Sequence, residues 1–257
     1  MPRFAANLSL LFTELPFLDR FEAAADAGFT AVECQFPYEV AAHEVAERLR
    51  RHKIEPVLFN MPPGNWAAGD RGLAALPERQ GEFKESVGTA LRYARSCGCK
   101  RLHAMAGIAE PTDAAALSTY RANLAYAAEV AARDEVTVLI EPINRRDMPG
   151  YFLSDYERAA DLISAIGSDA LRLQFDIYHR QMICGRVLDG LRELLAVIGH
   201  IQIAGIPGRH EPDGSELDFS VIFAEIDRLG YDGFIGCEYR PRSTTSAGLG
   251  WLSSYLV

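Results

Sequence analysis

Four hydrophobic segments in the second half of the chain each have a carboxylate or amide at or near their end. VTVLIE ends on Glu141, LRLQFD on Asp176 and GFIGCE on Glu238, and HIQIA carries Gln202. A carboxylate beside β-branched and aromatic residues is costly unless it is paired or binds a cation. Successive members are separated by roughly 30 residues, the length of one strand and its following helix. In adjacent parallel strands, the four polar groups would meet at one end of the sheet.

Such a set of side chains is suited to binding a hard cation. Three carboxylates and an amide oxygen favour Mg²⁺ or Mn²⁺ over a structural Zn²⁺, which prefers cysteine and histidine. A single buried acid is more often paired with an arginine. Four polar residues at successive strand ends instead favour a functional site. We therefore expect Glu141, Asp176, Gln202 and Glu238 to form a metal site.

The residue pattern alternates strand and helix from one end of the chain to the other. Strands are expected at 4–9, 31–36, 56–60, 101–106, 136–141, 171–176, 200–204 and 234–238. Helices are expected between them, including 78–96 and 112–133. Ser154 and Glu157 have the spacing of a capping box, which predicts a helix from there through Ile166. Left-handed helix ends are expected at four glycines: Gly28, Gly98, Gly167 and Gly230.

The length of 257 residues fits either one large α/β barrel or two ordinary domains. Eight strand–helix units without a Pro/Gly/Ser-rich linker favour a single (β/α)₈ TIM-barrel domain over residues 1–257. A doubly wound sheet is the alternative. It usually carries a glycine-rich phosphate turn after its first strand, and NLSLLF has none. In a barrel, the active site lies at the carboxyl ends of the strands, where the four polar residues are predicted.

Composition narrows the class of protein. With 26 Lys and Arg against 35 Asp and Glu, the net charge of −9 argues against nucleic acid or an anionic membrane as the main partner. Five cysteines without a CxxC pair predict reduced, buried thiols rather than a disulfide framework. The N-terminus lacks a signal-peptide pattern, and no apolar run reaches 18 residues. A soluble cytoplasmic protein is expected.

Two stretches that follow strands are longer than simple connectors. Residues 60–77 contain Trp66, and residues 205–218 contain Arg209 and His210. Both would overhang the catalytic end of a barrel, where long loops act as lids or pocket walls. A surface insertion or a subunit contact is the alternative for each.

Several motifs resemble those of the hydroxypyruvate isomerases, which belong to the xylose-isomerase-like TIM-barrel superfamily together with ketose 3-epimerases and endonuclease IV. They are IEPIN (140–144), FDIYH (175–179), GHIQIA (199–204) and IGCEYRP (235–241). RFAANLSLLF near the start, NWAAGDRG at 65–72 and TTSAGL near the end extend the similarity. The resemblance thus spans nearly the whole chain.

The resemblance implies a role for each matching residue. Glu141 and Glu238 match the two acids that move the proton and also touch the metal, and Asp176 and Gln202 match the other metal ligands. His179 matches a substrate-contacting histidine. The sugar epimerases have histidine at the position of Gln202, whereas hydroxypyruvate-isomerase-like members have glutamine. The glutamine therefore weighs against an epimerase.

An acidic substrate needs a cationic partner for its carboxylate. Arg209 is the first choice and matches a substrate-binding arginine of the family, with His210 and Arg240 behind it. For the latter two, a solvated surface charge is an equally good interpretation. Trp66 could close over a small substrate, or it could anchor a subunit interface.

The resemblance implies an isomerase that interconverts hydroxypyruvate and tartronate semialdehyde through an enediolate stabilised by a divalent metal. A 2-oxotetronate isomerase, acting on a four-carbon 2-oxo acid, is the near alternative, and a ketose 3-epimerase is a third. A DNA endonuclease and a non-catalytic metabolite-binding barrel are the alternatives of other classes. The expected partner is a small hydroxy-oxo acid, and a homodimer or homotetramer is expected from the family.

Overall fold

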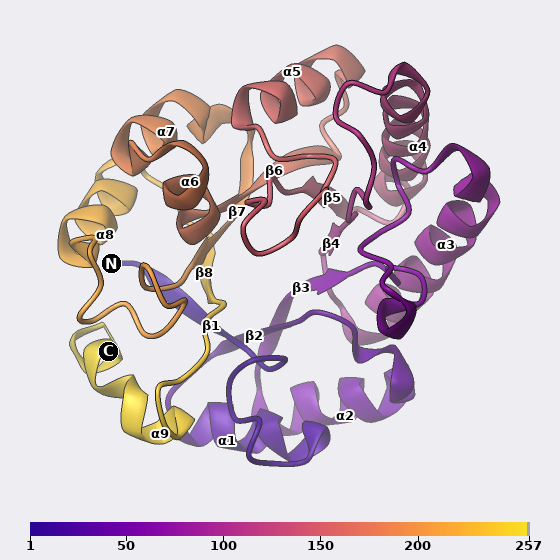
Figure 1. Cartoon of the computed structure of the whole chain (residues 1–257). Coiled ribbons are helices and arrows are strands. Elements are labelled where there is room, and N and C mark those ends of the chain that lie inside the picture. Colours follow the sequence, from indigo (N-terminus) through magenta and orange to yellow (C-terminus); the bar gives the residue numbers. More distant parts are fainter. Residues whose placement is uncertain (256–257) are drawn as a thin grey trace.

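The eight predicted strands form a closed barrel with helices around it (Figure 1). The structure is a computed structural model and describes residues 1–255. The strands are β1 (Arg3–Asn7), β2 (Ala31–Cys34), β3 (Glu55–Asn60), β4 (Arg101–His103), β5 (Thr137–Ile140), β6 (Leu171–Asp176), β7 (Ile198–Ile203) and β8 (Phe234–Cys237). Each pairs in parallel with the next, and β1 pairs with β8 to close the ring. The predicted TIM barrel is confirmed.

The helices follow the strands in the order that the alternation predicts. They are α1 (Arg20–Asp26), α2 (Ala42–His52), α3 (Gln80–Cys97), α4 (Ala114–Ala132), α5 (Tyr156–Ile166), α6 (Ile177–Cys184), α7 (Val187–Leu194), α8 (Phe219–Arg228) and α9 (Thr245–Gly248). Short 3₁₀ segments are η1 (Phe17–Asp19), η2 (Pro37–Glu39), η3 (Trp66–Ala68), η4 (Pro77–Arg79), η5 (Leu195–Val197) and η6 (Leu249–Ser254). Helices α6 and α7 both lie between β6 and β7.

The helix ends confirm one sequence rule and correct another. Gly28, Gly98, Gly167 and Gly230 all have positive φ, as predicted. The capping box at Ser154 is wrong, because the N-cap of α5 is Asp155, whose carboxylate accepts a hydrogen bond from the amide of Arg158. Aspartate caps a helix as well as serine does, so the helix begins one residue later.

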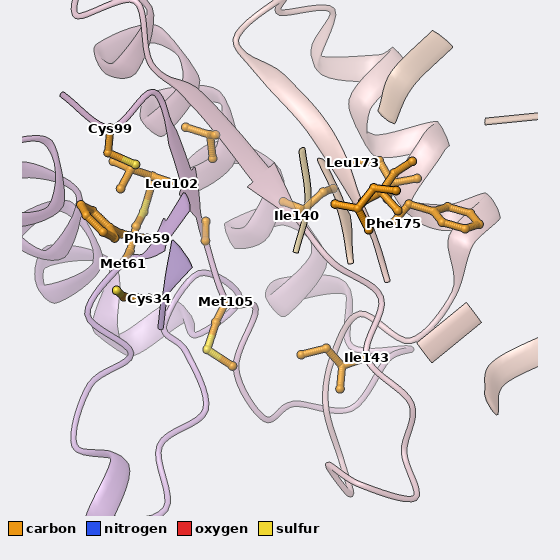
Figure 2. Close-up of a cluster of buried hydrophobic side chains, with 14 of the residues drawn as sticks. Cys34, Phe59, Met61, Cys99, Leu102, Met105, Ile140, Ile143, Leu173 and Phe175 are labelled. Atoms are coloured by element: carbon orange, nitrogen blue, oxygen red, sulfur yellow. The ribbon is translucent and has the colours of Figure 1, made fainter. Parts of the chain in front are cut away.

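Two apolar layers stabilise the barrel. The larger one lies between strands and helices, and Figure 2 shows part of it, with Phe59 and Leu102 in one group and Leu173 and Phe175 in another. A smaller buried cluster comprises Ala5, Ala31, Val57, Leu58, Leu139 and Phe234. On their strands, Ala5 and Leu139 lie two residues before Asn7 and Glu141, so they face the same side. This small cluster therefore contributes an apolar floor beneath the polar end of the barrel.

A layer of buried polar side chains lies between that floor and the mouth of the barrel. It comprises Asn7, Glu33, Gln174, His200 and Gln202, each at most 1% exposed. Gly236 of β8 stands beside Gln202 in the strand register. A Cβ atom at position 236 would overlap the Glu33 carboxylate, so glycine makes room for that charge.

The structure also tests the expectations for the cysteines and for a membrane-spanning segment. Within the described part of the chain, all five cysteines are free thiols. Four are buried as predicted, but Cys184 is exposed, which corrects that part of the prediction. Among residues 1–255, no helix combines the length and the apolar character needed to cross a membrane.

Substituting Gly236 by alanine should destabilise the protein, because the added methyl group has to displace the Glu33 carboxylate in a packed interior. We expect a loss of about 1–3 kcal/mol in the free energy of unfolding, measured by urea denaturation. Gly81→Ala is the matched control, since a Cβ at that position in α3 meets nothing within 4 Å among the described residues. Equal stability of Gly236→Ala and the unmodified protein would contradict this account of the interior.

Candidate active site

A cavity of ≈ 490 Å³ opens at the carboxyl ends of the strands. Glu141 and Glu238, the residues that follow β5 and β8, both line it, together with His179 and Arg209. Asp176, the last residue of β6, is fully buried and contacts the cavity-lining residues His179 and Arg209. The structure therefore brings together the three acids that the sequence predicts at successive strand ends.

Glu141 is buried and only partly hydrogen-bonded. Its Oε2 accepts a hydrogen bond of 3.1 Å from Gln174 Nε2 and lies 3.6 Å from His103 Nδ1. Among the described residues, its Oε1 has no hydrogen-bond partner. Burial, with the neighbouring Glu238 and Asp176 carboxylates, raises the pKa of Glu141 well above its usual value. An oxygen of this kind is suited to accepting a proton or binding a cation.

Asp176 also presents one free oxygen. Its Oδ1 accepts the backbone N–H of Tyr178 at 2.8 Å and caps the start of α6. Its Oδ2 has no hydrogen-bond partner in the described part of the chain. Burial raises the pKa of Asp176 to about 7, although the Arg209 guanidinium opposes the shift. The turn into α6 thus fixes one oxygen and directs the second toward the site.

Glu238 is held more firmly than the other two acids. Its Oε1 accepts hydrogen bonds from Gln35 Nε2 at 2.9 Å and from Asn7 Nδ2 at 3.4 Å. Its Oε2 accepts a hydrogen bond from Arg209 Nη2 at 2.6 Å. Burial raises the pKa of Glu238, and the Arg209 charge opposes this rise.

Arg209 is the cation that contacts two of the three acids. Its Nη2 lies 2.6 Å from Glu238 and 3.6 Å from Asp176. Burial by itself would lower the pKa of Arg209, but the Glu238 and Asp176 carboxylates raise it above its usual value. One positive charge among three buried carboxyl groups leaves excess negative charge, which favours a further cation or bound protons.

The hydrogen bonding of His179 fixes the position of its proton. The backbone N–H of Asn144 points at His179 Nδ1, at 3.4 Å, and the Asn144 side-chain amide lies 2.7 Å from the same atom. Nδ1 is therefore an acceptor, which places the hydrogen on Nε2. Nε2 lies 3.6 Å from Asp176 Oδ2 and 3.8 Å from Glu141 Oε1. Burial lowers the pKa of His179 well below its usual value, so the ring is neutral and donates from Nε2.

A divalent cation fits this group of atoms. One ligand atom each of Glu141, Asp176 and His179 lie within 4.8 Å of one another, and all three residues are buried. Glu141 Oε1 and Asp176 Oδ2 are hard donor atoms, and neither has a hydrogen-bond partner among the described residues. In the His179 tautomer described above, Nε2 carries the hydrogen and is a donor, so the carboxylates are the better ligands for a cation.

Gln202, the fourth predicted ligand, lies in the buried polar layer beneath this group. Its Oε1 accepts a hydrogen bond of 2.6 Å from Gln174 Nε2, and its Nε2 donates to Glu33 Oε1 at 2.8 Å. Both ends of the amide are therefore engaged.

The remaining predicted residues divide into two groups. Trp66 and Arg240 line the cavity, as does Arg209. His210 is not among the described lining residues, and its Nδ1 lies 2.8 Å from the carbonyl oxygen of Arg240.

Both long loops form walls of the cavity, as the sequence predicts. The first contributes Trp66 and Arg71, whose guanidinium lies 4.0 Å from the Trp66 ring centroid. An ion pair of 2.7 Å between Arg79 and Asp70 fixes the base of this loop. The second loop contributes Pro207, Gly208 and Arg209.

Sequence reasoning missed several residues of the site. His103 and Gln35 line the cavity, and Arg146 and Asp147 come from the loop after β5. Burial lowers the pKa of His103 to about 3, so it is neutral beside Glu141. Gln174 was detectable, because it lies two residues before Asp176 on one strand and must face the same side. The others stand in loops or on strands whose pattern carries no such signal.

Comparisons with known proteins agree with this geometry. The sequence model described as xylose isomerase-like TIM barrel matches residues 21–255. A protein of Cupriavidus necator named 2-oxo-tetronate isomerase is 55% identical, over 100% of this chain and 99% of that protein. A protein of Escherichia coli named hydroxypyruvate isomerase is 42% identical, over 99% of this chain and 100% of that protein. A crystal structure of a protein from Brucella melitensis, named AP endonuclease, family 2, has 46% identity and a TM-score of 0.97, covering 99% of both chains.

Binding of Mn²⁺ should depend on pH through Asp176. A carboxyl ligand must lose its proton to bind a metal, and the pKa of Asp176 is about 7. We therefore expect the Mn²⁺ affinity, measured by the shift in Tm on titration, to fall at least about tenfold for each pH unit below 7, because Glu141, the other proposed ligand, also has a raised pKa. Asp176→Asn should remove most of the shift. A shift of equal size in Asp176→Asn, or one independent of pH, would contradict this assignment.

Proposed function

We propose, on the ground that the chain belongs to the xylose isomerase-like TIM-barrel family, that it is an isomerase of small hydroxy-2-oxo acids. The reaction moves a carbonyl between C2 and C3 of a substrate whose C1 is a carboxylate. The observation that carries the proposal is the pair of buried glutamates with raised pKa, Glu141 and Glu238, facing one small cavity. They come from β5 and β8, which are not neighbours in the barrel, so a substrate can lie between them.

The chemistry needs a base and an acid in turn. One carboxylate removes a proton from C3, beside the C2 carbonyl, and gives an enediolate. A proton then returns to C2, the C3 hydroxyl loses its proton and the C2 oxygen gains one, so that atoms and charge balance. A raised pKa brings Glu141 and Glu238 closer to the pH at which such transfers are efficient. His179 would donate a hydrogen bond from Nε2 to a substrate oxygen.

Glu141 and Asp176 would hold a divalent ion, Mg²⁺ or Mn²⁺, through their free oxygens. The ion supplies Lewis-acid stabilisation of enediolate charge when bound. Glu238 and Gln202 are the other two predicted ligands. Glu238 is engaged by Arg209, and Gln202 by Gln174 and Glu33, so the site proposed here would hold the ion through Glu141 and Asp176.

The substrate carboxylate would meet the arginines of the cavity wall. Arg209 is committed to Glu238 and Asp176, so it can offer the substrate only the remaining donors of its guanidinium. Arg71, Arg146 and Arg240 also line the cavity and add positive charge on the loop side. Trp66 gives this wall an apolar face beside Arg71. His210, tied to the Arg240 carbonyl, would act by holding this wall in place.

Two substrates of this class fit the proposal. Hydroxypyruvate ends at C3, whereas 2-oxotetronate carries one further hydroxymethyl group on C3. We place 2-oxotetronate first, because the relative of that name is 55% identical and the hydroxypyruvate isomerase is 42% identical. A cavity of ≈ 490 Å³ has room for the fourth carbon.

The name of the Brucella protein, AP endonuclease, suggests cleavage of DNA at abasic sites as a second candidate function. DNA binding relies on a basic surface, and this chain has a net charge of −9. In the described residues, a single group of three possible metal ligands was found, with one histidine in it. These features favour the isomerase.

Purified protein supplied with Mg²⁺ or Mn²⁺ should turn over 2-oxotetronate and hydroxypyruvate, with the higher kcat/KM for 2-oxotetronate. Fructose should not react, because it lacks the carboxylate for which the arginines are placed. The measurement is a steady-state assay of each compound, with abasic-site DNA as a fourth substrate. Turnover of fructose alone, or cleavage of the DNA without turnover of either acid, would contradict the proposal.

Two variants test the assigned roles of the acid and the base. Glu141→Gln and Glu238→Gln keep the size of each side chain and remove its ability to move a proton. Each should lower kcat by about 10²–10⁴-fold. Activity that survives both changes would show that these residues are not the acid and base.

A further inference from the structure

We propose that Glu33 is a positioning residue that orients both active-site glutamates through two hydrogen-bonded arms. The proposal rests on the function proposed above for Glu141 and Glu238. Glu33 lies on β2, is fully buried and does not line the cavity. It therefore acts on the substrate only through other side chains.

The first arm leads from Glu33 to Glu141. Gln202 Nε2 donates to Glu33 Oε1 at 2.8 Å, and Gln202 Oε1 accepts from Gln174 Nε2 at 2.6 Å. The same Gln174 nitrogen donates to Glu141 Oε2 at 3.1 Å. A carboxylate oxygen accepts hydrogen bonds, so Glu33 turns the amide nitrogen of Gln202 toward itself and the amide oxygen of Gln202 toward Gln174. Gln174 must then present its nitrogen to both Gln202 and Glu141.

The second arm leads from Glu33 to Glu238 through one residue. Asn7 Nδ2 donates to Glu33 Oε1 at 2.8 Å and to Glu238 Oε1 at 3.4 Å. Asn7 Oδ1 accepts the backbone N–H of Ser9 at 3.0 Å, which fixes the orientation of the amide. The nitrogen is thereby held between the two carboxylates.

His200 anchors Glu33 at the centre of this network. Its Nε2 lies 2.7 Å from Glu33 Oε2, and both residues are at most 1% exposed. Gly236 supplies the space for the carboxylate, since a Cβ there would overlap it. A buried carboxylate that accepts three hydrogen bonds is a rigid reference point for the groups around it.

The test is Glu33→Gln, which keeps the shape but leaves a single acceptor oxygen where three donors now converge on two. At least one of the three contacts is then lost or has to reverse its direction, and the glutamates lose their fixed orientation. We expect kcat to fall by about 10–100-fold with little change in KM, as when the partner of a reacting group is lost. Glu225→Gln is the matched control, because Glu225 of α8 is a buried glutamate that pairs with Arg192 and Arg228 and does not line the cavity. It should keep the unmodified kcat.

A double-mutant cycle separates positioning from general damage. If Glu33 acts through Gln174, the loss in the Glu33→Gln, Gln174→Met double variant should be well below the product of the two single losses. Multiplying losses, an unmodified kcat in Glu33→Gln, or an equal loss in Glu225→Gln would overturn the proposal. If Glu33→Gln does not fold, Gln174→Met and Asn7→Ala break the arms singly, and an unmodified kcat in both would overturn it.

A crystal structure of Glu33→Gln beside the unmodified protein keeps the two proposals distinguishable. We expect the Glu141 or the Glu238 carboxylate to have rotated, and unchanged positions of both would overturn the role of Glu33. This comparison of two crystal structures does not depend on enzymatic activity. If the unmodified protein turns over neither acid, the proposed function fails, while the crystal comparison still decides the positioning role.

Discussion

The burial of acidic side chains at one end of the barrel is the constraint on which the rest of the site depends. Glu141, Asp176 and Glu238 are all buried, and Arg209 is the guanidinium that contacts two of them. Burying a carboxylate disfavours its charged form, and like charges nearby disfavour it further. A protein keeps such an arrangement where the excess negative charge has a use, and proton transfer beside a divalent ion is one that the cavity permits.

The fold follows from this constraint and from the two-residue alternation of the strands. Parallel strands deliver their last residues to one end of the barrel, which is why acids far apart in sequence meet. Beneath them, Asn7, Glu33, Gln174 and Gln202 form a hydrogen-bonded layer. The apolar floor lies below that layer. Orientation of the acids is thus set from beneath, while the long loops define the space above them.

Much of this was predictable from the sequence. All eight strands lie where the pattern places them, and β6 has the predicted bounds. The acids at the ends of β5, β6 and β8 were recognisable because an isolated carboxylate ends an apolar run. The hydrogen-bond partners were not recognisable. Glu33 sits inside a short strand, and its partner His200 lies far away in sequence, so only the closed barrel reveals the pair.

Local rules failed where two residues compete or where a side chain has two uses. Asp155 rather than Ser154 caps α5, because both precede the same helix and both can accept the amide. His210 contacts a backbone carbonyl instead of the cavity.

The most direct test of the central claim is anomalous diffraction from a crystal soaked in Mn²⁺. The account predicts one peak within bonding distance of Glu141 and Asp176. A structure in which both acids keep only protein partners, with no peak between them, would contradict it.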